Sequence, residues 1–578
     1  MRTLIALLLL IAAPPAWADF PETASESSLG IRPQKLLYPE GDIRRYGASE
    51  AVTDNSAAIN AALKVSGSGG ASAYIPAGTW NVAQSLYPFR DSSIHGEGAN
   101  SVLKVADVPA FVFLAAPVYS GTQAANRQFR DIAIINANQT DSANVAITIN
   151  FSVPSGSRVT GVVFSNLYIA GWNTAFFLRG AWNCDFIGNK LYNNHVGFDF
   201  LGQNIKNSLI SNHIINGSMT GTGESIGVWT QSTEGESTQS LHLLANYVYY
   251  YAYSLKADLV FELVCEANDF SASTHYGIYI ATTMGGVTID GGWVESLSGG
   301  YGVYVAALRT RNYGDIRIRN VHIRLDNAIA GSRGVFIGAG QWGVTVEDCL
   351  VEGFDQGITN DAAAAVTIQQ NRIDCLTSVY SRSSYALQIN SLSDRNVVGP
   401  NAIIYGNTNA GSAFLQAALM SRSSARITVS AVANYPIGTP IMFDASANGF
   451  SAEQTYWVVG SSGTSIEVAA TIGGPALEAT GSAPLNVYAA PLPLTFNVAG
   501  TPPHLVYTQA DMRGRTRVSD RTSYAVVFAI PLPSADYYVQ LAAGEPALDP
   551  WVGEKTRYGF QVHAARPATQ GVDWSVGY

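Results

Sequence analysis

The stretch Ile187-Gly188-Asn189-Lys190-Leu191 reads apolar, small, asparagine, any residue, apolar, and it decides the fold because it recurs along the chain. The other copies are Phe164-Ser-Asn166-Leu-Tyr168, Ile210-Ser-Asn212-His-Ile214, Leu244-Ala-Asn246-Tyr-Val248 and Ile318-Arg-Asn320-Val-His322. Variants of the pattern place Asp131, Asn268, Gly292, Asp348 and Asn371 at the same point. From Asn166 to Asn371 the successive steps are 23, 23, 34, 22, 24, 28, 28 and 23 residues. Such self-similarity is typical of stacked structural repeats.

The repeat predicts an all-β fold, a right-handed single-stranded parallel β-helix in which each copy marks a tight turn. Asparagine tolerates left-handed backbone and can hydrogen-bond to neighbouring backbone. Coils of short strands stack about 4.8 Å apart, and no coil can bury its apolar face alone. The position two residues after the turn is therefore predicted to point into the core. Its occupants are Tyr168, Leu191, Ile214, Val248, Phe270, Val294, His322, Leu350 and Ile373.

Side chains alternate along a strand, so the positions one and three residues after the turn should point outward. They carry Asp269 on one coil and Trp293 with Glu295 on the next, preceded by Tyr247 and Tyr249. Asp269 and Glu295 lie one coil and two residues apart, which separates their backbones by roughly 8 Å. Cleavage of a glycosidic bond needs two carboxyl groups flanking the scissile oxygen. We therefore predict Asp269 and Glu295 as a catalytic pair, with Tyr247, Tyr249 and Trp293 offering flat faces for sugar rings.

Two further acids, Glu266 and Asp290, occupy what reads as an extra residue before the turn on the same coils. Stacked carboxylates about 5 Å apart should raise one pKa, so both are added to the catalytic candidates. A local bulge at this point would aim the side chains outward. The structural alternative is that outward positions of a solenoid are simply polar and that exposed aromatic residues stack on each other.

Four segments precede the repeat: Asp42-Ile-Arg-Arg-Tyr46-Gly-Ala48, Thr53-Asp54-Asn55 to Leu63, Ala73-Tyr-Ile75 to Trp80 and Ile94-His-Gly-Glu-Gly98. Together they resemble the start of pectate-lyase-superfamily and phage-tailspike chains. Physically, Asp54 can cap a helix whose apolar side is Ile59 and Leu63, and this helix closes the end of the solenoid. Asp290-Gly-Gly-Trp293-Val-Glu295 is similar to a segment of tailspike-like depolymerases. The resemblance implies a parallel β-helix over residues 36–410 that acts on a polysaccharide.

Motifs of two branches of that superfamily are absent from the sequence. We find no Asn-Thr-Asp, Asp-Asp, Gly-His-Gly and Arg-Ile-Lys series, which polygalacturonases carry. Of the Tyr-Gly-Phe-Asp-Pro-His motif of mannuronan epimerases and alginate lyases, only Tyr276-Gly277 is present. Neither of these specific activities is supported.

Residues 1–18 read as a signal peptide, with an apolar run from Leu4 to Ala13 and Ala16-Trp-Ala18 before Asp19. This predicts a secreted or periplasmic protein whose residues 19–35 form an N-terminal extension. No later stretch is apolar over the length of a membrane-spanning helix. The formal net charge is −10, so a basic surface for nucleic acid is not expected. The four cysteines predict one disulfide at most and have no zinc-site spacing.

After Asn409 the coil pattern stops and short alternating strands follow. We predict a small β-domain over residues 411–490 and a C-terminal β-domain over residues 491–578. The second resembles the lectin-like tips of trimeric tail fibres, and that resemblance implies a homotrimer.

Three functions are compatible with these patterns. The first is a glycoside hydrolase in which Glu295 or Asp269 is the general acid and the other is the base or nucleophile. The second is a polysaccharide lyase in which acids bind Ca²⁺ or neutralise a uronate while His275, Tyr276 or a basic residue abstracts a proton. The third is a carbohydrate-binding surface protein without catalysis. His275 and Arg324 are also candidate sugar contacts, Glu352 and Asp374 form a second acid pair, and a hydrolase needs no cofactor or metal.

Overall fold

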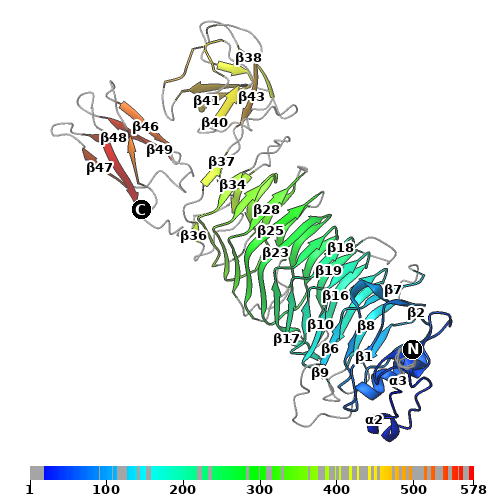
Figure 1. The fold of residues 1–578 in the computed structure, drawn as a ribbon. Coiled ribbons are helices and arrows are strands. Elements are labelled where there is room, and N and C mark those ends of the chain that lie inside the picture. The colour runs from blue at the N-terminus through cyan, green and yellow to red at the C-terminus, as the bar shows by residue number, and fades with distance from the viewer. Residues whose placement is uncertain are drawn as a thin grey trace, which may run out of the picture. The chain divides into compact units, whose positions relative to one another are not determined.

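The computed structural model of the chain divides into two compact units, residues 1–271 and residues 272–578, which are described one at a time. It describes residues 19–577 except 90, 107, 114–126, 139–143, 152–157, 218–223, 232–236, 282–284, 298–299, 307–314, 327–330, 362, 364, 375–384, 390–396, 399–401, 405–414, 420–425, 429–439, 444–447, 452–455, 471–474, 479, 481–484, 490–493, 497–512, 517–522, 528–537, 544–549, 557–558 and 564–571. The fold is the predicted right-handed parallel β-helix, with strands of successive coils paired in parallel (Figure 1).

In the first unit each coil contributes three short strands, as in β14 (Asp185–Ile187), β15 (Lys190–Tyr192) and β16 (Val196–Leu201). The first strand position runs through β6 (Arg127–Arg130), β10 (Val162–Ser165), β14, β17 (Ile205–Ile210), β20 (Gln239–Leu244) and the start of β23 (Leu263–Ser273). The second runs through β4 (Ser101–Val105), β7 (Ala133–Asn136), β11 (Tyr168–Ala170), β15, β18 (His213–Ile215), β21 (Tyr247–Tyr249) and the end of β23. The third runs through β5 (Phe111–Phe113), β8 (Val145–Asn150), β12 (Thr174–Arg179), β16, β19 (Ile226–Gln231) and β22 (Tyr253–Ala257).

The interior of this unit is held by stacked asparagines and stacked phenylalanines. Asn212 donates through Nδ2 to the Asn246 Oδ1 at 2.9 Å and to the Phe186 carbonyl at 2.8 Å. Its Oδ1 accepts from the backbone N–H and the side chain of Asn189 at 3.0 and 2.9 Å. Phe176 and Phe198 lie parallel with ring centroids 4.7 Å apart. Identical residues one coil apart therefore satisfy each other's hydrogen bonds or stack ring against ring in the core.

Replacing Asn212 by alanine is expected to lower the free energy of unfolding by about 3 kcal/mol, because several buried donors and acceptors lose their partner at once. The matched control is Asn166→Gly. Asn166 is exposed at φ 52°, and glycine adopts this conformation easily, so the change should cost less than about 1 kcal/mol. Denaturant unfolding of both variants checks this. Equal losses would mean that the buried asparagine stack contributes no more than a surface turn.

The asparagine of the repeat occupies one of two structural positions in the turn, and these two positions lie one residue apart. Asn166, Asn320, Asp131 and Asp348 themselves have positive φ, between 52° and 58°. In the other coils the preceding residue has positive φ and the asparagine after it is buried, as at Asn189, Asn212, Asn246, Asn268 and Asn371. The predicted inward direction is confirmed for Leu191, Ile214, Val248, Phe270, Val294 and Ile373. It is wrong for Tyr168, His322 and Leu350, because the buried positions of those coils are Ile169, Ile323 and Val351.

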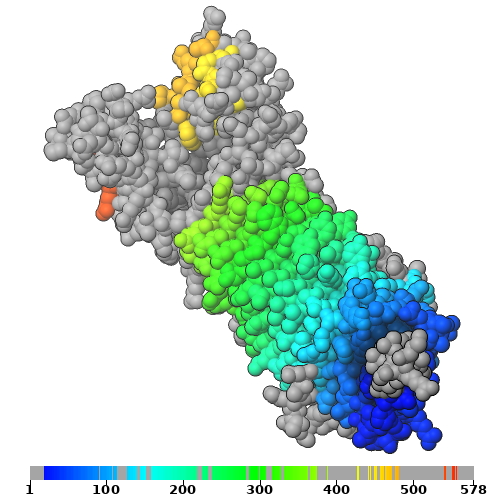
Figure 2. Space-filling view, viewed as in Figure 1, coloured from blue at the N-terminus to red at the C-terminus, as the bar shows by residue number. Residues whose placement is uncertain are grey.

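The N-terminal end of the first unit is closed by the segment before the coils, the dark blue end of Figure 2. Helix α3 (Ser56–Ser66) buries Ile59 and Leu63, as predicted. Asp54 Oδ1 accepts from the Ser56 backbone N–H at 2.9 Å, but the N-cap residue is Asn55, one position later than predicted, and it makes no side-chain cap hydrogen bond. The remaining elements here are α2 (Ala24–Ser28), η1 (Ile43–Tyr46), η2 (Gly98–Asn100), β1 (Ala73–Tyr74), β2 (Gly78–Val82) and β3 (Ile94–His95), with β9 (Val159–Thr160) and β13 (Ala181–Trp182) farther along the unit.

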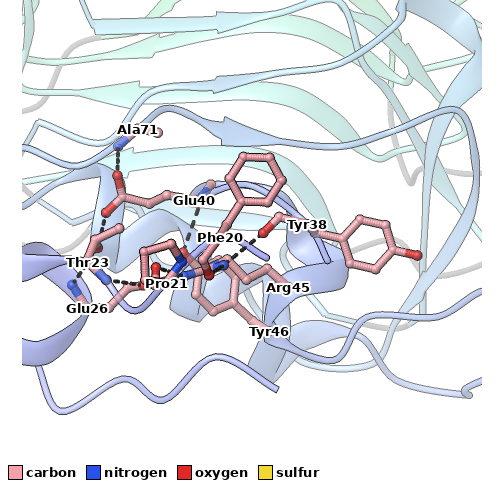
Figure 3. A network of polar contacts seen from close by, with 10 residues as sticks. Phe20, Pro21, Thr23, Glu26, Tyr38, Glu40, Arg45, Tyr46 and Ala71 are labelled. Carbon is pink, nitrogen blue, oxygen red and sulfur yellow. Dashed lines mark hydrogen bonds and ion pairs between the residues drawn. The ribbon is translucent and has the colours of Figure 1, made fainter. Parts of the chain in front are cut away.

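A buried ion pair ties residues 20–38 to this end (Figure 3). Arg45 and Glu26 are both fully buried, and Arg45 contacts the two Glu26 oxygens at 2.6 and 2.9 Å. The guanidinium also donates to the carbonyls of Phe20, Tyr38 and Pro21 at 2.9, 2.8 and 2.7 Å. Burial acts to raise the pKa of Glu26, but hydrogen bonds from Arg45 and the Thr23 backbone outweigh it and lower the pKa to about 2. The N-terminal extension is thus an ordered part of the first unit.

The second unit has the same coil geometry. Its first strand position runs through β25 (Val287–Ser296), β27 (Ile316–Arg319), β30 (Val344–Glu347), β33 (Thr367–Gln369) and β36 (Val397–Val398). The second runs through β25, β28 (His322–Leu325), β31 (Leu350–Glu352), β34 (Arg372–Asp374) and β37 (Ala402–Ile404). The third runs through β24 (Tyr276–Ile280), β26 (Tyr301–Val305), β29 (Arg333–Ile337), β32 (Gln356–Asn360), β35 (Tyr385–Ile389) and β44 (Leu494–Phe496).

Small antiparallel sheets follow the coils, as predicted. A closed barrel contains β38 (Leu415–Leu419), β39 (Arg426–Thr428), β40 (Pro440–Phe443), β41 (Tyr456–Ser462), β42 (Ser465–Ala469) and β43 (Leu485–Ala489). Two three-stranded sheets contain β45 (Arg513–Thr516), β47 (Tyr538–Ala543) and β50 (Val572–Gly577), and β46 (Ser523–Val527), β48 (Trp551–Thr556) and β49 (Gly559–His563). Strand β44 pairs with β35 and so belongs to the solenoid, although its sequence lies in the predicted C-terminal domain.

Cys184, Cys265 and Cys349 are buried free thiols, and Cys375 lies outside the described residues. Within the described part of the chain, no helix has the length and apolar character needed to cross a membrane.

Candidate functional site

The second unit gathers acids, an arginine, a histidine and a tryptophan on the outer side of β25, β28 and β31. We call Trp293, Glu295, His322, Arg324 and Glu352 the acid–arginine face. Trp293 pairs in register with His322, and Glu295 pairs with Arg324, which pairs with Glu352. Val294 and Ile323, between these residues in sequence, are buried. The alternation of a strand therefore places all five side chains on the outer surface, as predicted for Trp293 and Glu295.

Glu352 contacts two other residues of this face. Its Oε1 lies 2.9 Å from His322 Nε2 and 3.8 Å from Arg324 Nε. Arg324 also contacts Asp326 at 3.1 Å, so its guanidinium is shared between two carboxylates. The Trp293 and His322 rings meet edge to face, with centroids 4.1 Å apart. The arrangement holds carboxylates around one cation beside an aromatic ring.

Glu295 and Glu352 are two strand steps apart in one register column. Each step is about 4.8 Å, so their backbones are separated by roughly 10 Å. Carboxyl groups of inverting glycosidases lie about 6.5–9.5 Å apart, which leaves room for a water molecule. Two glutamate side chains leaning toward each other from this backbone separation reach that range. The pair can therefore supply both proton transfers of a hydrolysis.

The other two predicted catalytic acids occupy different environments. Asp290 contacts Arg319 at 2.9 Å and accepts from the side chain of Asn320 at 2.9 Å, so it ties two coils together. Glu266 is exposed in the first unit and pairs in register with Leu244. The register between β20 and β23 runs without a break, so the bulge predicted at Glu266 is absent. The sequence comparison counted an extra residue there because it matched the buried Cys265 to the exposed Leu244, whereas Cys265 pairs in register with the buried Leu243.

In the first unit the outer side of β18, β21 and β23 carries His213, Tyr247, Tyr249 and Asp269, and Tyr250 follows directly after β21. We call these five residues the tyrosine face. The Tyr247 and Tyr249 rings are nearly parallel with centroids 5.7 Å apart, and Tyr249 and Tyr250 are exposed. Tyr247 pairs in register with Asp269. Burial raises the pKa of Asp269, and a hydrogen bond from the Ser271 hydroxyl opposes this. The face thus combines aromatic surface with a carboxyl that retains its proton more readily than usual.

The predicted residues are distributed over both units. Asp269, Glu266, Tyr247 and Tyr249 belong to the first, and Glu295, Asp290, Trp293, His275 and Arg324 belong to the second. The pairing of Asp269 with Glu295, and the stacking of Glu266 with Asp290, stay predictions. His275 is exposed, and its Nδ1 lies 3.2 Å from the Thr274 hydroxyl. Sequence reasoning assigned His322 to the core, and Asp326 had no repeat signal that identified it.

Asp199 is a buried carboxylate that the sequence comparison did not single out. It lies on β16 between Phe177 of β12 and Trp229 of β19 in the register, and it is 6% exposed. Gln231 donates to it at 2.8 Å, and the Trp229 indole N–H donates to Asp258 at 2.7 Å. Burial raises the pKa of Asp199 to about 6, against an opposing hydrogen bond from Gln231. Burial of Asp199 therefore destabilises the folded state at any pH at which its carboxyl group is ionised.

The raised pKa of Asp199 predicts the direction in which the stability of the protein changes with pH. Because the pKa is raised from its ordinary 3.8 to about 6, the folded state binds the proton more tightly, and the protein gains stability as pH falls from above 6 to below 4. The full difference corresponds to about 3 kcal/mol. Asp199→Asn keeps an acceptor for Gln231 and should therefore stabilise the protein at pH 8 but not at pH 4. Thermal unfolding at both pH values checks this, and an equal effect at the two would contradict it.

Among the described residues no group of three or more histidine, cysteine, aspartate or glutamate side chains is arranged to hold a metal ion. The Ca²⁺ that a lyase mechanism would use therefore has no site of this kind in the described part of the chain.

The coils and their faces define a tailspike-like parallel β-helix protein. The chain is similar to the tail spike protein of Shigella phage Sf6, with 24% identity over 368 aligned residues. The match covers 57% of this chain and 57% of that relative, so the chain spans somewhat more than half of its length. No protein-family model matches the sequence.

Solved structures with a similar arrangement include the catalytic unit of a GH87 α-1,3-glucanase from Streptomyces thermodiastaticus, at 12% identity and TM-score 0.47, covering 68% of this chain and 71% of that one. The surface adhesin PfbA of Streptococcus pneumoniae has 11% identity and TM-score 0.44, covering 58% and 97%. The Dettilon tailspike protein has 13% identity and TM-score 0.34, covering 93% of both chains. All three scores lie below 0.5, so these likenesses say nothing about the chemistry of the present chain.

Proposed function

We propose that this protein is an exported polysaccharide depolymerase, a glycoside hydrolase that cleaves within a polysaccharide chain. The observation that carries the proposal is the acid–arginine face, where Glu295 and Glu352 flank Arg324 in one register column beside Trp293. The similarity to a phage tail spike protein supports a carbohydrate as the ligand.

In the proposed reaction Glu295 is the general acid and Glu352 is the general base. Glu295 protonates the glycosidic oxygen as the bond to the anomeric carbon breaks. Glu352 takes a proton from water, whose oxygen forms the new bond to that carbon from the opposite side. The Trp293 ring packs against the apolar face of a sugar and orients it. Arg324 and His322 hold Glu352 in place.

The tyrosine face of the first unit is proposed as a separate carbohydrate-binding surface. Its exposed rings, Tyr249 and Tyr250, offer apolar surface, and their hydroxyls can exchange hydrogen bonds with sugar hydroxyls. Asp269 is the second candidate for the general acid, since burial raises its pKa. The Asp269 and Glu295 pair that the sequence predicts is tested separately below.

A hydrolase is favoured over a lyase because the arginine beside the proposed catalytic acids is already paired with carboxylates. A lyase must neutralise the uronate carboxylate of its substrate, yet Arg324, the arginine of the acid–arginine face, is already engaged by Asp326 and Glu352. A further carboxylate would displace one of these acids into an environment with less positive charge. Neutral sugars at the cleaved linkage require no such exchange.

The deciding measurement is product analysis on a panel of bacterial and plant polysaccharides. New reducing ends without the ultraviolet absorbance of unsaturated sugars support the hydrolase. Absorbing unsaturated products would establish the lyase instead. Binding without new reducing ends, unchanged in Glu295→Gln, would leave a carbohydrate-binding protein.

We further propose that residues 1–18 are removed on export and that the protein forms a homotrimer. N-terminal sequencing of the exported protein should start at Asp19. Sedimentation equilibrium should return three times the chain mass, and a monomer would contradict the trimer.

A further inference from the structure

His322 connects two parts of the acid–arginine face. From β28 it reaches sideways to Trp293 of β25, with ring centroids 4.1 Å apart, and to Glu352 of β31, with Nε2 2.9 Å from Oε1. Its own register partners are Trp293 and Leu350, so the bond to Glu352 runs diagonally to the next outward position of β31. The imidazole is about one quarter exposed and the Glu352 side chain about one third.

We propose that His322 is a positioning residue, which fixes the Glu352 carboxylate for its role as general base. The inference rests on the proposed hydrolase function. An ionised carboxylate only accepts hydrogen bonds, so Nε2 of His322 carries the proton that it donates. The Trp293 ring packs edge to face against the imidazole of His322 and so restricts its orientation.

The contacts leave one carboxylate oxygen for chemistry. Both His322 and Arg324 approach Oε1 of Glu352, and this leaves Oε2 to take the proton from water. A glutamate on the surface of a solenoid otherwise samples several rotamers. A misplacement of about 1 Å in a catalytic group can cost about a hundredfold in rate. Loss of the imidazole should therefore lower kcat while substrate binding, which depends on the aromatic residues, stays similar.

The competing explanation is a surface ion pair that ties two coils together. Such a contact would contribute less than about 1 kcal/mol to stability and nothing to turnover. The two explanations predict different kinetic constants. A positioning residue lowers kcat and leaves KM nearly unchanged when it is removed, whereas the loss of a purely structural contact leaves kcat unchanged.

The test compares His322→Leu with His322→Gln. Leucine removes the donor, whereas the glutamine amide can place an N–H near the position of Nε2. We expect His322→Leu to lower kcat about 10- to 100-fold with KM changed less than about threefold. His322→Gln should recover most of the loss, and both variants should melt within a few degrees of wild type. The proposal is overturned if His322→Leu retains kcat, if only KM changes, or if glutamine and leucine lower kcat equally.

A second measurement keeps the inference testable if the wild type cleaves no polysaccharide, in which case the proposed function itself fails. With ¹⁵N-labelled histidine, the Nε2 resonance of His322 should report a protonated nitrogen in wild type and should shift in Glu352→Gln. An unchanged resonance would show that His322 does not hold Glu352, whatever the activity.

Discussion

Glu295→Gln is expected to lower the kcat for release of reducing ends by about 10²- to 10⁴-fold. The glutamine side chain keeps the size and hydrogen-bonding capacity of glutamate but cannot protonate the leaving oxygen, and general acid catalysis contributes about 10²- to 10⁴-fold. KM should stay within a few fold, because Trp293 and the rest of the acid–arginine face are intact. Steady-state kinetics on the polysaccharide identified in the panel provide the measurement.

The matched control is Glu347→Gln. Glu347 is also outward on the second unit, where it accepts from Gln369 at 3.2 Å and pairs in register with Arg319. It lies outside the acid–arginine face, so its turnover should equal that of wild type. Glu352→Gln and Asp269→Asn then identify the partner of Glu295. Loss in Glu352→Gln alone supports the pair proposed here, and loss in Asp269→Asn alone supports the pair predicted from the sequence. Full activity of Glu295→Gln would reject both.

The largest effect on stability is expected at the buried ion pair of the first unit. Arg45→Met should destabilise the N-terminal end by about 3–5 kcal/mol, because it leaves the Glu26 carboxylate buried without its charge partner. Three backbone carbonyls lose their donor at the same time. Hydrogen exchange of the amides of residues 26–46 measures the loss directly, since this end can open locally while the coils stay folded.

Arg44→Met is the matched control. Arg44 pairs with Asp42 at 2.6 Å, and its side chain is 35% exposed while that of Asp42 is only 2% exposed. Its removal should therefore cost more than the roughly 1 kcal/mol of a surface pair. The cost should stay below that of Arg45→Met, because Asp42 still accepts from the Arg44 backbone N–H at 2.9 Å. The contribution of Glu26 to the stability of this end changes with pH in one direction. Because the pKa of Glu26 is lowered from 4.5 to about 2, its contribution is complete above pH 4.5 and is lost as pH falls through 2. Equal protection in the two variants would show that the N-terminal segment is not held by Arg45.

The repeat alone was sufficient to predict the coils. Stacked coils place the same requirement on every turn, and that requirement appears in the sequence as a recurring asparagine with an apolar residue two positions later. The outward direction of Trp293 and Glu295 followed from the same alternation, and the structure places both as predicted. The capping helix α3 was predictable because Asp54, Ile59 and Leu63 are all local to it.

The partners of these residues were not predictable in the same way. Asparagine is found both at the positive-φ position of the turn and at the buried position that follows it. The same sequence pattern therefore describes two structural positions that differ by one residue. A shift of one residue turns every side chain of a strand to the opposite face. For this reason His322 was predicted in the core, whereas the structure places it outward against Trp293 and Glu352.

By itself, then, the sequence determined that the chain winds into a parallel β-helix with an acidic, aromatic outer surface, because coil length and strand alternation are periodic along the chain. Only the tertiary structure decided which side chains meet on that surface. The three residues Glu295, Arg324 and Glu352 are 29 and 28 positions apart in the sequence, and coil stacking brings them into one column. Likewise, Arg45 reaches Glu26 only because the N-terminal segment folds back over the end of the first unit. Such contacts depend on register and burial, which no local pattern specifies.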